Sequence, residues 1–175
     1  MIEVESKYWS PGNSAVVAAL NKLGAKKLSD LTMEDVYFGH PSRDFGKTDE
    51  AIRLRKKEDG AELTYKGPRM KGTLAKAREE ISVKVEDPLS VQRILERLGF
   101  RETYTVTKKR SAYQLDKLRV EVDLVDGLGE FVELEVLTES PDRAAALFET
   151  ARAELGLSRL EQKTYLELLI ERKEK

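Results

Sequence analysis

Two pairs of glutamates have the spacing expected of cation ligands on β-strands. Glu3 and Glu5, and likewise Glu133 and Glu135, are two residues apart within segments that alternate polar and apolar residues. Residues i and i+2 of a strand share one face about 7 Å apart, so each pair would present its carboxylates together. Carboxylate oxygens are ligands of hard cations such as Mg²⁺ and Mn²⁺. The spacing therefore favours a divalent-cation site.

Basic residues follow the same alternation as the glutamates. Arg53 and Arg55 share one side of an alternating segment, and further polar sides carry Lys7, Lys66, Lys84, Lys108 and Arg110. Guanidinium and ammonium groups bind phosphate oxygens, so a row of them suits an oligophosphate. Together with the carboxylates, they predict a site for metal and polyphosphate. Solvated strand faces with surface ion pairs would show the same alternation and are the alternative.

Hydrophobic periodicity defines the elements that would position these side chains. Alternation predicts strands over 2–8, 33–39, 51–57, 61–66, 80–86, 103–115, 118–125 and 130–137. Helical spacing predicts helices from Asn13, as the cap, to Gly24, over 88–98, from Pro141 to about 155, and over 158–173. Asp59-Gly60 predicts a hairpin, and residues 67–79 a basic loop. Each half contains one strand, one helix and three strands, whether by internal duplication or in unrelated halves.

The apolar faces of these strands determine where the helices pack. Amphipathic helices need an aliphatic sheet surface, which Ile52/Leu54, Ile81/Val83 and similar faces supply. The fold expected is α+β: an eight-stranded antiparallel β-barrel, or tunnel, with helices outside and a charged interior, in one domain of residues 1–175. Buried unpaired ions cost several kcal/mol each, so this interior must hold water, ions or a charged ligand.

Composition excludes several classes of function. With 31 Lys and Arg against 32 Asp and Glu, the chain has no global basic field, so we expect neither a nucleic-acid nor a membrane partner. The absence of Cys excludes disulfides, thiolate zinc sites and a cysteine nucleophile, and favours a cytoplasmic protein. No secretory leader or membrane-spanning run is expected. A charged fraction of 36% with few amide residues is typical of heat-adapted proteins.

The ordered set of charged motifs resembles the CYTH family, the triphosphate tunnel metalloenzymes. Glu3-Val-Glu-Ser-Lys7 resembles the Glu-x-Glu-x-Lys hallmark of this family. The similarity runs from residue 1 to about residue 137 and extends to Tyr165. The further matching segments are Ala51–Arg55, Leu63–Gly67, Arg78–Ile81, Lys108–Arg110, Val122-Asp123, Gly127–Gly129 and Phe131–Glu135. A lone Glu-x-Glu-x-Lys would be weak evidence, whereas the whole set in this order is specific.

The resemblance implies a role for each of these residues. By it, Mg²⁺ or Mn²⁺ would be held by Glu3, Glu5, Asp123, Glu133 and Glu135. The triphosphate would be bound by Lys7, Arg53, Arg55, Lys66, Lys84, Lys108 and Arg110, with Glu80 and Glu121 as supporting acidic residues. No further catalytic group is expected, because positioning and charge neutralisation can accelerate phosphoryl chemistry by themselves.

The choice of reaction rests on a subgroup resemblance. Asp35–Phe38, Pro41–Phe45, Thr48–Glu50 and Gly127–Gly129 resemble class IV adenylyl cyclases, which implies conversion of ATP into 3′,5′-cyclic AMP and pyrophosphate. An inorganic or organic, thiamine-type triphosphatase with the same tunnel is one alternative. A non-catalytic polyphosphate- or nucleotide-binding module is another.

Aromatic residues and strand edges have simpler expected roles. Trp9 is expected to pack at a strand end rather than to bind a nucleobase, and Tyr165 to lie in the core by its helical spacing. A homodimer formed through a sheet edge is a further expectation.

Overall fold

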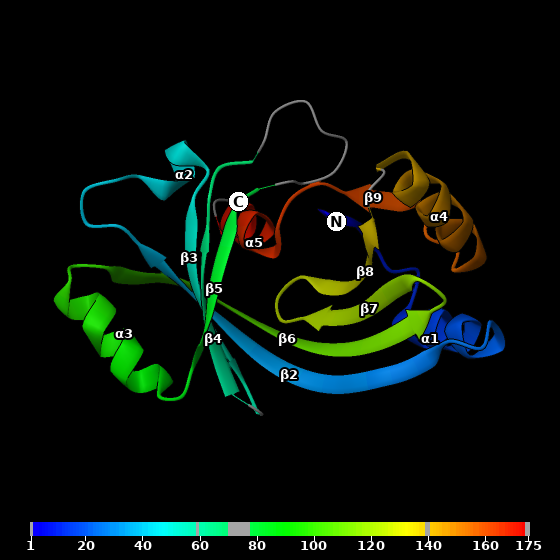
Figure 1. The fold of residues 1–175 in the computed structure, drawn as a ribbon, viewed down its shortest axis with the longest axis horizontal. Coiled ribbons are helices and arrows are strands. Elements are labelled where there is room, and N and C mark those ends of the chain that lie inside the picture. The colour runs from blue at the N-terminus through cyan, green and yellow to red at the C-terminus, as the bar shows by residue number, and fades with distance from the viewer. Residues whose placement is uncertain (1, 59, 70–77, 139–140, 174–175) are drawn as a thin grey trace. The chain divides into compact units, whose positions relative to one another are not determined.

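The computed structural model describes residues 2–58, 60–69, 78–138 and 141–173, and all their side chains except those of residues 2, 3 and 141–143 (Figure 1). Its strands are β1 (Ile2–Trp9), β2 (Lys26–Gly39), β3 (Ala51–Lys57), β4 (Gly60–Lys66), β5 (Glu80–Val85), β6 (Arg101–Leu115), β7 (Leu118–Val125), β8 (Gly129–Thr138) and β9 (Arg159–Glu161). Its helices are α1 (Asn13–Lys22), α2 (Phe45–Thr48), α3 (Pro88–Arg97), α4 (Pro141–Glu154) and α5 (Tyr165–Lys173).

The strands form one antiparallel sheet in the order β5-β4-β3-β2-β6-β7-β8-β1-β9. This confirms the predicted α+β class and the strand, helix, three-strand sequence of each half, apart from the additional short helix α2. Among the described residues the sheet has nine strands rather than eight, and β5 and β9 end the order. The antiparallel sheet is therefore confirmed, whereas its closure into a barrel stays a prediction.

The chain forms two compact units. Unit 1 contains the described residues of 1–31 and 108–175, and unit 2 those of 32–72 and 77–107. In unit 1, helices α1 and α4 pack on the apolar side of β1, β7 and β8. This core includes Leu20 of α1, Phe148 of α4, and Val120, Val132 and Leu134 of the strands. Alternation therefore leaves the polar side chains of these strands on the opposite face.

Unit 2 has a smaller core, in which α3 packs on β3. Leu95 of α3 meets Val36, Phe38 and Leu54, and partly buried residues surround them. The expectation that helices cover Ile81/Val83 is wrong, because these side chains are 60% and 58% exposed. The reason is their place on β5, at the end of the strand order, whereas the buried side of α3 faces β3.

Two predicted helix boundaries also need correction. Asn13 is the first residue of α1 rather than its cap, and its Nδ2 donates to the Asp123 carbonyl at 3.0 Å. The predicted helix over 158–173 is interrupted, because β9 pairs with β1 before α5 begins. Thr164 and Glu167 form a reciprocal capping box, in which each side chain accepts the other's backbone N–H and starts α5.

Turns at two predicted helix ends have the expected geometry. Gly24 and Gly99 follow α1 and α3 with φ of +75° and +92°, the left-handed region that glycine adopts readily. Lys57 pairs with Gly60 across the predicted hairpin, and Asp59 of this hairpin lies outside the described residues. Residues 70–77 of the predicted basic loop also lie outside them. Of the helices that are described, none is both long and apolar enough to cross a membrane.

Candidate functional site

The register of β1, β7 and β8 places charged residues side by side on the polar face of unit 1. Glu5 is paired with Glu135, and Lys7 with Glu133. On the other side of β8, Glu121 is paired with Glu133. Since the apolar side chains of the same strands face α1 and α4, acid and base are concentrated on one surface.

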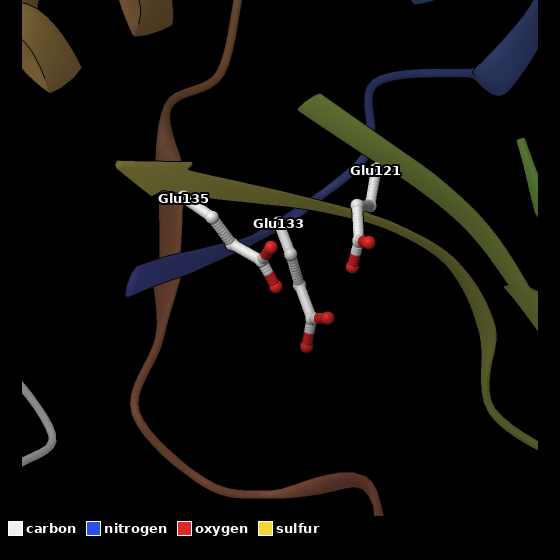
Figure 2. A group of neighbouring side chains, drawn as sticks. All are labelled: Glu121, Glu133 and Glu135. Atoms are coloured by element: carbon white, nitrogen blue, oxygen red, sulfur yellow. The ribbon is translucent and has the colours of Figure 1, made fainter. Parts of the chain in front are cut away.

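Three carboxylates of this face gather closely enough to share one cation. Glu121 comes from β7, and Glu133 and Glu135 come from β8; Figure 2 shows their carboxylates converging. One oxygen from each lies within 4.8 Å of the others. Glu121 and Glu133 are buried and Glu135 is half-buried. Carboxylate oxygens in this number fit Mg²⁺ or Mn²⁺ better than a soft metal.

Arg110 links these carboxylates to Asp123. Its Nε donates to Asp123 Oδ1 at 2.6 Å, and its other nitrogens donate to Asp123, Glu121 and Glu133. All four side chains are buried. Burial alone would lower the pKa of Arg110, but Asp123 and Glu133 raise it well above its ordinary value. The guanidinium therefore remains a fixed positive charge between three acids.

Arg119 and two lysines also contact the carboxylates of this network. Arg119 Nε donates to Glu121 Oε1 at 2.8 Å and lies 3.6 Å from Glu135 Oε2. Lys108 Nζ lies 3.1 Å from Asp123 Oδ2, and Lys7 Nζ lies 3.5 Å from Glu133 Oε1. Lys7 also donates to the carbonyl oxygen of Lys163 at 3.0 Å. Both lysines are buried.

Asp123 and Glu133 stay ionised in spite of their burial. Burial raises the pKa of Asp123, but Arg110 and Lys108 outweigh it and lower that pKa below its ordinary value. Burial acts on Glu133 in the same direction, and Arg110, Lys108 and Lys7 lower the pKa of its carboxyl far below the ordinary range. Both groups therefore carry full negative charge at neutral pH.

Aromatic residues border the network in unit 1. The Tyr165 hydroxyl donates to Asp123 Oδ2 at 2.9 Å, a contact that spacing on the last helix does not predict. Tyr165 also meets Phe131 with ring centroids 5.0 Å apart, and Phe131 meets Trp9 at 4.3 Å. The Arg159 guanidinium lies over the Trp9 ring, 4.4 Å from its centroid. Trp9 therefore packs within the protein, as its place at a strand end predicts.

Unit 2 holds a second, more basic group of predicted site residues. Arg55 donates to both oxygens of Asp35, at 2.6 and 2.7 Å, and Arg53 Nη1 lies 3.9 Å from Asp35. The buried Nε of Arg53 has no hydrogen-bond partner among the described residues. Asp35 was not among the predicted site residues. Its place in an alternating segment puts it on a strand face, but its pairing with Arg55 follows from the register between β2 and β3, which alternation alone does not give.

Of the other predicted site residues, Lys66, Glu80 and Lys84 belong to unit 2, and Glu3 and Glu5 lie on β1 of unit 1. Lys66 Nζ lies 2.7 Å from Glu80 Oε1, and Lys84 is exposed on β5. Glu5 is half-buried on β1, and the Glu3 backbone lies in the same strand, although its side chain is outside the described part. The structure thus gathers Lys7, Lys108, Arg110, Glu121, Asp123, Glu133 and Glu135 in unit 1, and Arg53 and Arg55 in unit 2.

Comparison with known proteins places this geometry in context. A Methanocaldococcus jannaschii protein named "Putative adenylate cyclase MJ0240" is 38% identical over 174 residues, covering 96% of this chain and 98% of its own length. The structure of PH1819 from Pyrococcus horikoshii superposes with a TM-score of 0.86 at 36% identity, covering 98% of this chain and 99% of its own.

A more distant neighbour shares the fold. HpAC1 from Hippeastrum, which is described as having a dominant triphosphatase activity, has a TM-score of 0.76 at 19% identity, over 98% of this chain and 96% of its own. The sequence model of the CYTH domain matches residues 1–167. The chain therefore belongs to the CYTH domain family.

Proposed function

We propose that this protein is a divalent-metal-dependent enzyme that acts on the triphosphate of a nucleotide, converting ATP into 3′,5′-cyclic AMP and pyrophosphate. The observation that carries the proposal is the group formed by Glu121, Glu133 and Glu135 beside the buried cations of unit 1. The adenylate cyclase name of the M. jannaschii relative supports the choice of reaction.

Ionised carboxylates favour a metal-dependent enzyme over a simple polyphosphate-binding module. Glu133 remains charged at neutral pH because Arg110 and the two lysines lower its pKa. Like charges repel, so a cluster of carboxylates weakens the binding of a polyphosphate unless a cation lies between them. A module that only binds anions would do better without these acids.

The carboxylates of unit 1 suit a divalent cation. Glu121, Glu133 and Glu135 would coordinate Mg²⁺ or Mn²⁺, with Glu3, Glu5 and Asp123 as the further ligands that the family resemblance predicts. When bound, the ion would neutralise phosphate charge and lower the pKa of the attacking oxygen.

The basic residues would bind and orient the substrate. Lys7 and Lys108 are held beside the carboxylates, so they can face phosphate oxygens without leaving the network. Arg53 and Arg55, with Lys66, Lys84 and Arg110, are the other proposed triphosphate ligands. Positive groups already in place stabilise charge that develops on phosphate oxygens, and they need no reorganisation during the reaction.

A triphosphatase is the second candidate. The described activity of HpAC1, which has the same fold, favours it. The same cations would bind the triphosphate, but water would attack the terminal phosphorus in place of the ribose 3′-oxygen attacking the α-phosphorus.

One product analysis separates these reactions. Purified protein is incubated with ATP, tripolyphosphate or thiamine triphosphate and with Mg²⁺ or Mn²⁺, and cyclic AMP, pyrophosphate and orthophosphate are resolved. Cyclic AMP with pyrophosphate is the expected result. Orthophosphate without cyclic AMP would establish the triphosphatase instead. Tight triphosphate binding with no product would overturn both enzymes in favour of the binding module.

A matched pair of variants ties the activity to the carboxylate group. E135Q removes one charge from the group, whereas E149Q makes the same change on α4, where Glu149 is exposed and pairs with Arg152. E135Q is expected to lower turnover at least tenfold at limiting metal, and E149Q to leave it unchanged. Equal turnover of the two variants would contradict the assignment.

A further inference from the structure

The segment that joins β9 to α5 brings two groups against the lysines of unit 1. The Lys163 carbonyl oxygen accepts a hydrogen bond from Lys7 Nζ at 3.0 Å, and the Tyr165 ring follows two residues later. This segment is anchored because Glu161 pairs with Lys7 in the sheet and accepts a hydrogen bond from Trp9 Nε1 at 3.0 Å. The C-terminal part of the chain is therefore fixed beside the charged network.

Both lysines lie against the same aromatic ring. Lys7 Nζ is 4.0 Å from the centroid of Tyr165, and Lys108 Nζ is 5.0 Å from it. Each distance is within the roughly 6 Å at which a cation is attracted to the electron-rich face of a ring. Since ring and lysines are buried, water screens this attraction little.

The orientation of the ring is itself fixed. The Tyr165 hydroxyl donates to Asp123 at 2.9 Å, and the ring packs edge-on against Phe131 at 5.0 Å. A side chain that only filled space would need neither this hydrogen bond nor the two ammonium groups. Two ammonium groups close together repel each other, so an attractive surface common to both offsets that repulsion.

We propose that Tyr165 is a positioning residue that holds Lys7 and Lys108 ready to bind a triphosphate. The inference rests on the proposed function, because it assigns these lysines to the phosphate-binding part of the site. Tyr165 acts through the lysines and contacts no reacting atom. The ring rather than the hydroxyl holds the lysines in place, because Asp123 keeps its contacts with Arg110 and Lys108 when the hydroxyl is removed.

Binding of inorganic tripolyphosphate, measured by calorimetry with Mg²⁺ present, tests the proposal. Y165F keeps the ring and is expected to bind within threefold of the parent, whereas Y165L is expected to bind about tenfold more weakly. Y113L is the matched control, because Tyr113 is equally buried in unit 1 but belongs to the apolar core. Y113L should lower the melting temperature without changing the dissociation constant. Equal affinity of Y165L and the parent would overturn the proposal.

A second background shows whether the ring acts through the lysines. In protein that carries K7M and K108M, the change from Tyr165 to Leu is expected to have no further effect on the dissociation constant. A tenfold effect that persists there would contradict the positioning role. Failure of the parent protein to bind either tripolyphosphate or ATP in the presence of Mg²⁺ would instead refute the proposed function, so the two failures are distinct.

Nuclear magnetic resonance of the parent protein covers the case in which Y165L does not fold. The ε-methylene protons of Lys7 and Lys108 should resonate upfield of other lysines because of the ring current, and should shift when tripolyphosphate is added. Ordinary lysine shifts at both positions would overturn the proposal without any variant.

Discussion

Unit 1 and unit 2 pair their charged side chains in different ways. In unit 1 the buried ions are balanced: Lys7, Lys108 and Arg110 against Glu121, Asp123 and Glu133. In unit 2 the buried Arg53 and the half-buried Arg55 both lie against the carboxylate of Asp35, and Glu62 lies 4.0 Å from Arg53. Glu135 lies 3.6 Å from Arg119 and converges with Glu121 and Glu133, and three carboxylates together suit a cation. The two guanidinium groups beside Asp35 in unit 2 suit an anion.

These two groups of charged side chains suit different ligands. A divalent cation needs several carboxylates that stay ionised, and these in turn need basic neighbours to be stable when buried. A phosphate group needs guanidinium groups that are oriented but not fully neutralised. The charged groups of unit 1 and of unit 2 therefore differ in the ligand that they suit, and variants can test each group by itself.

The largest expected effect is on stability, from R110M in unit 1. This change leaves Glu121, Asp123 and Glu133 buried around an uncharged side chain, which should cost about 3–5 kcal/mol in the free energy of unfolding. Urea unfolding measures the loss. R55M, which removes two hydrogen bonds to Asp35, should cost less, and equal losses would contradict the contrast between the units.

Activity should separate the units in a second way. E133Q is expected to raise the Mn²⁺ concentration needed for half-maximal turnover at least tenfold, because it removes a charged member of the carboxylate group. R53M is expected to raise the KM for the triphosphate about tenfold and to leave the metal requirement within twofold. Steady-state kinetics with metal and substrate varied independently distinguishes the two. Identical profiles would show that the units do not divide these roles.

The sequence predicts the charged faces well because alternation depends on local geometry. Residues i and i+2 share a strand face wherever the strand lies, so Glu133 and Glu135 could be paired from the sequence alone. The role of Asp35 could not be assigned in this way, because its bond to Arg55 depends on the register between two strands. The predicted metal and triphosphate ligands as a set stay predictions.

The C-terminal segment shows where periodicity is misleading. Apolar spacing predicted one helix over 158–173, although Thr164 and Glu167 carry the signature of a helix start. The apolar spacing correctly predicted that Tyr165 lies on the buried side of α5. The contact of its hydroxyl with Asp123, however, joins residues that are 42 positions apart in the sequence. Such long-range contacts between a helix and a strand face leave no periodic signal in either segment.

A smaller effect on activity is expected from D35N in unit 2. Asparagine keeps the size of the side chain but lacks the charge that fixes Arg55 through two hydrogen bonds. The KM for the triphosphate should rise about threefold to tenfold, with kcat nearly unchanged, because the guanidinium is less well oriented. E62Q is the control, since Glu62 lies 4.0 Å from Arg53 and is only half-buried. A fall in kcat without a change in KM would contradict a role in substrate capture.

The smallest expected effect comes from the helix that covers the core of unit 2. The Asp87 carboxylate caps α3 by accepting the backbone N–H groups of Leu89 and Ser90, each at 3.1 Å. Hydrogen bonds from Ser90 lower the pKa of Asp87. D87A should therefore lower the melting temperature of the protein by about 2–4 °C at pH 7. Amide hydrogen exchange should become faster in unit 2, because α3 covers its small core, and should not change in unit 1.

The same carboxylate predicts the pH dependence of this effect. A group whose pKa is lower in the folded state adds stability above its unfolded pKa of about 3.9, and loses it as pH falls through the folded value. The stability difference between the parent and D87N, which retains a capping oxygen but no charge, should thus be constant from pH 7 to about pH 5 and shrink below pH 4. A difference that grew on acidification would mean that the charge of Asp87 does not stabilise α3.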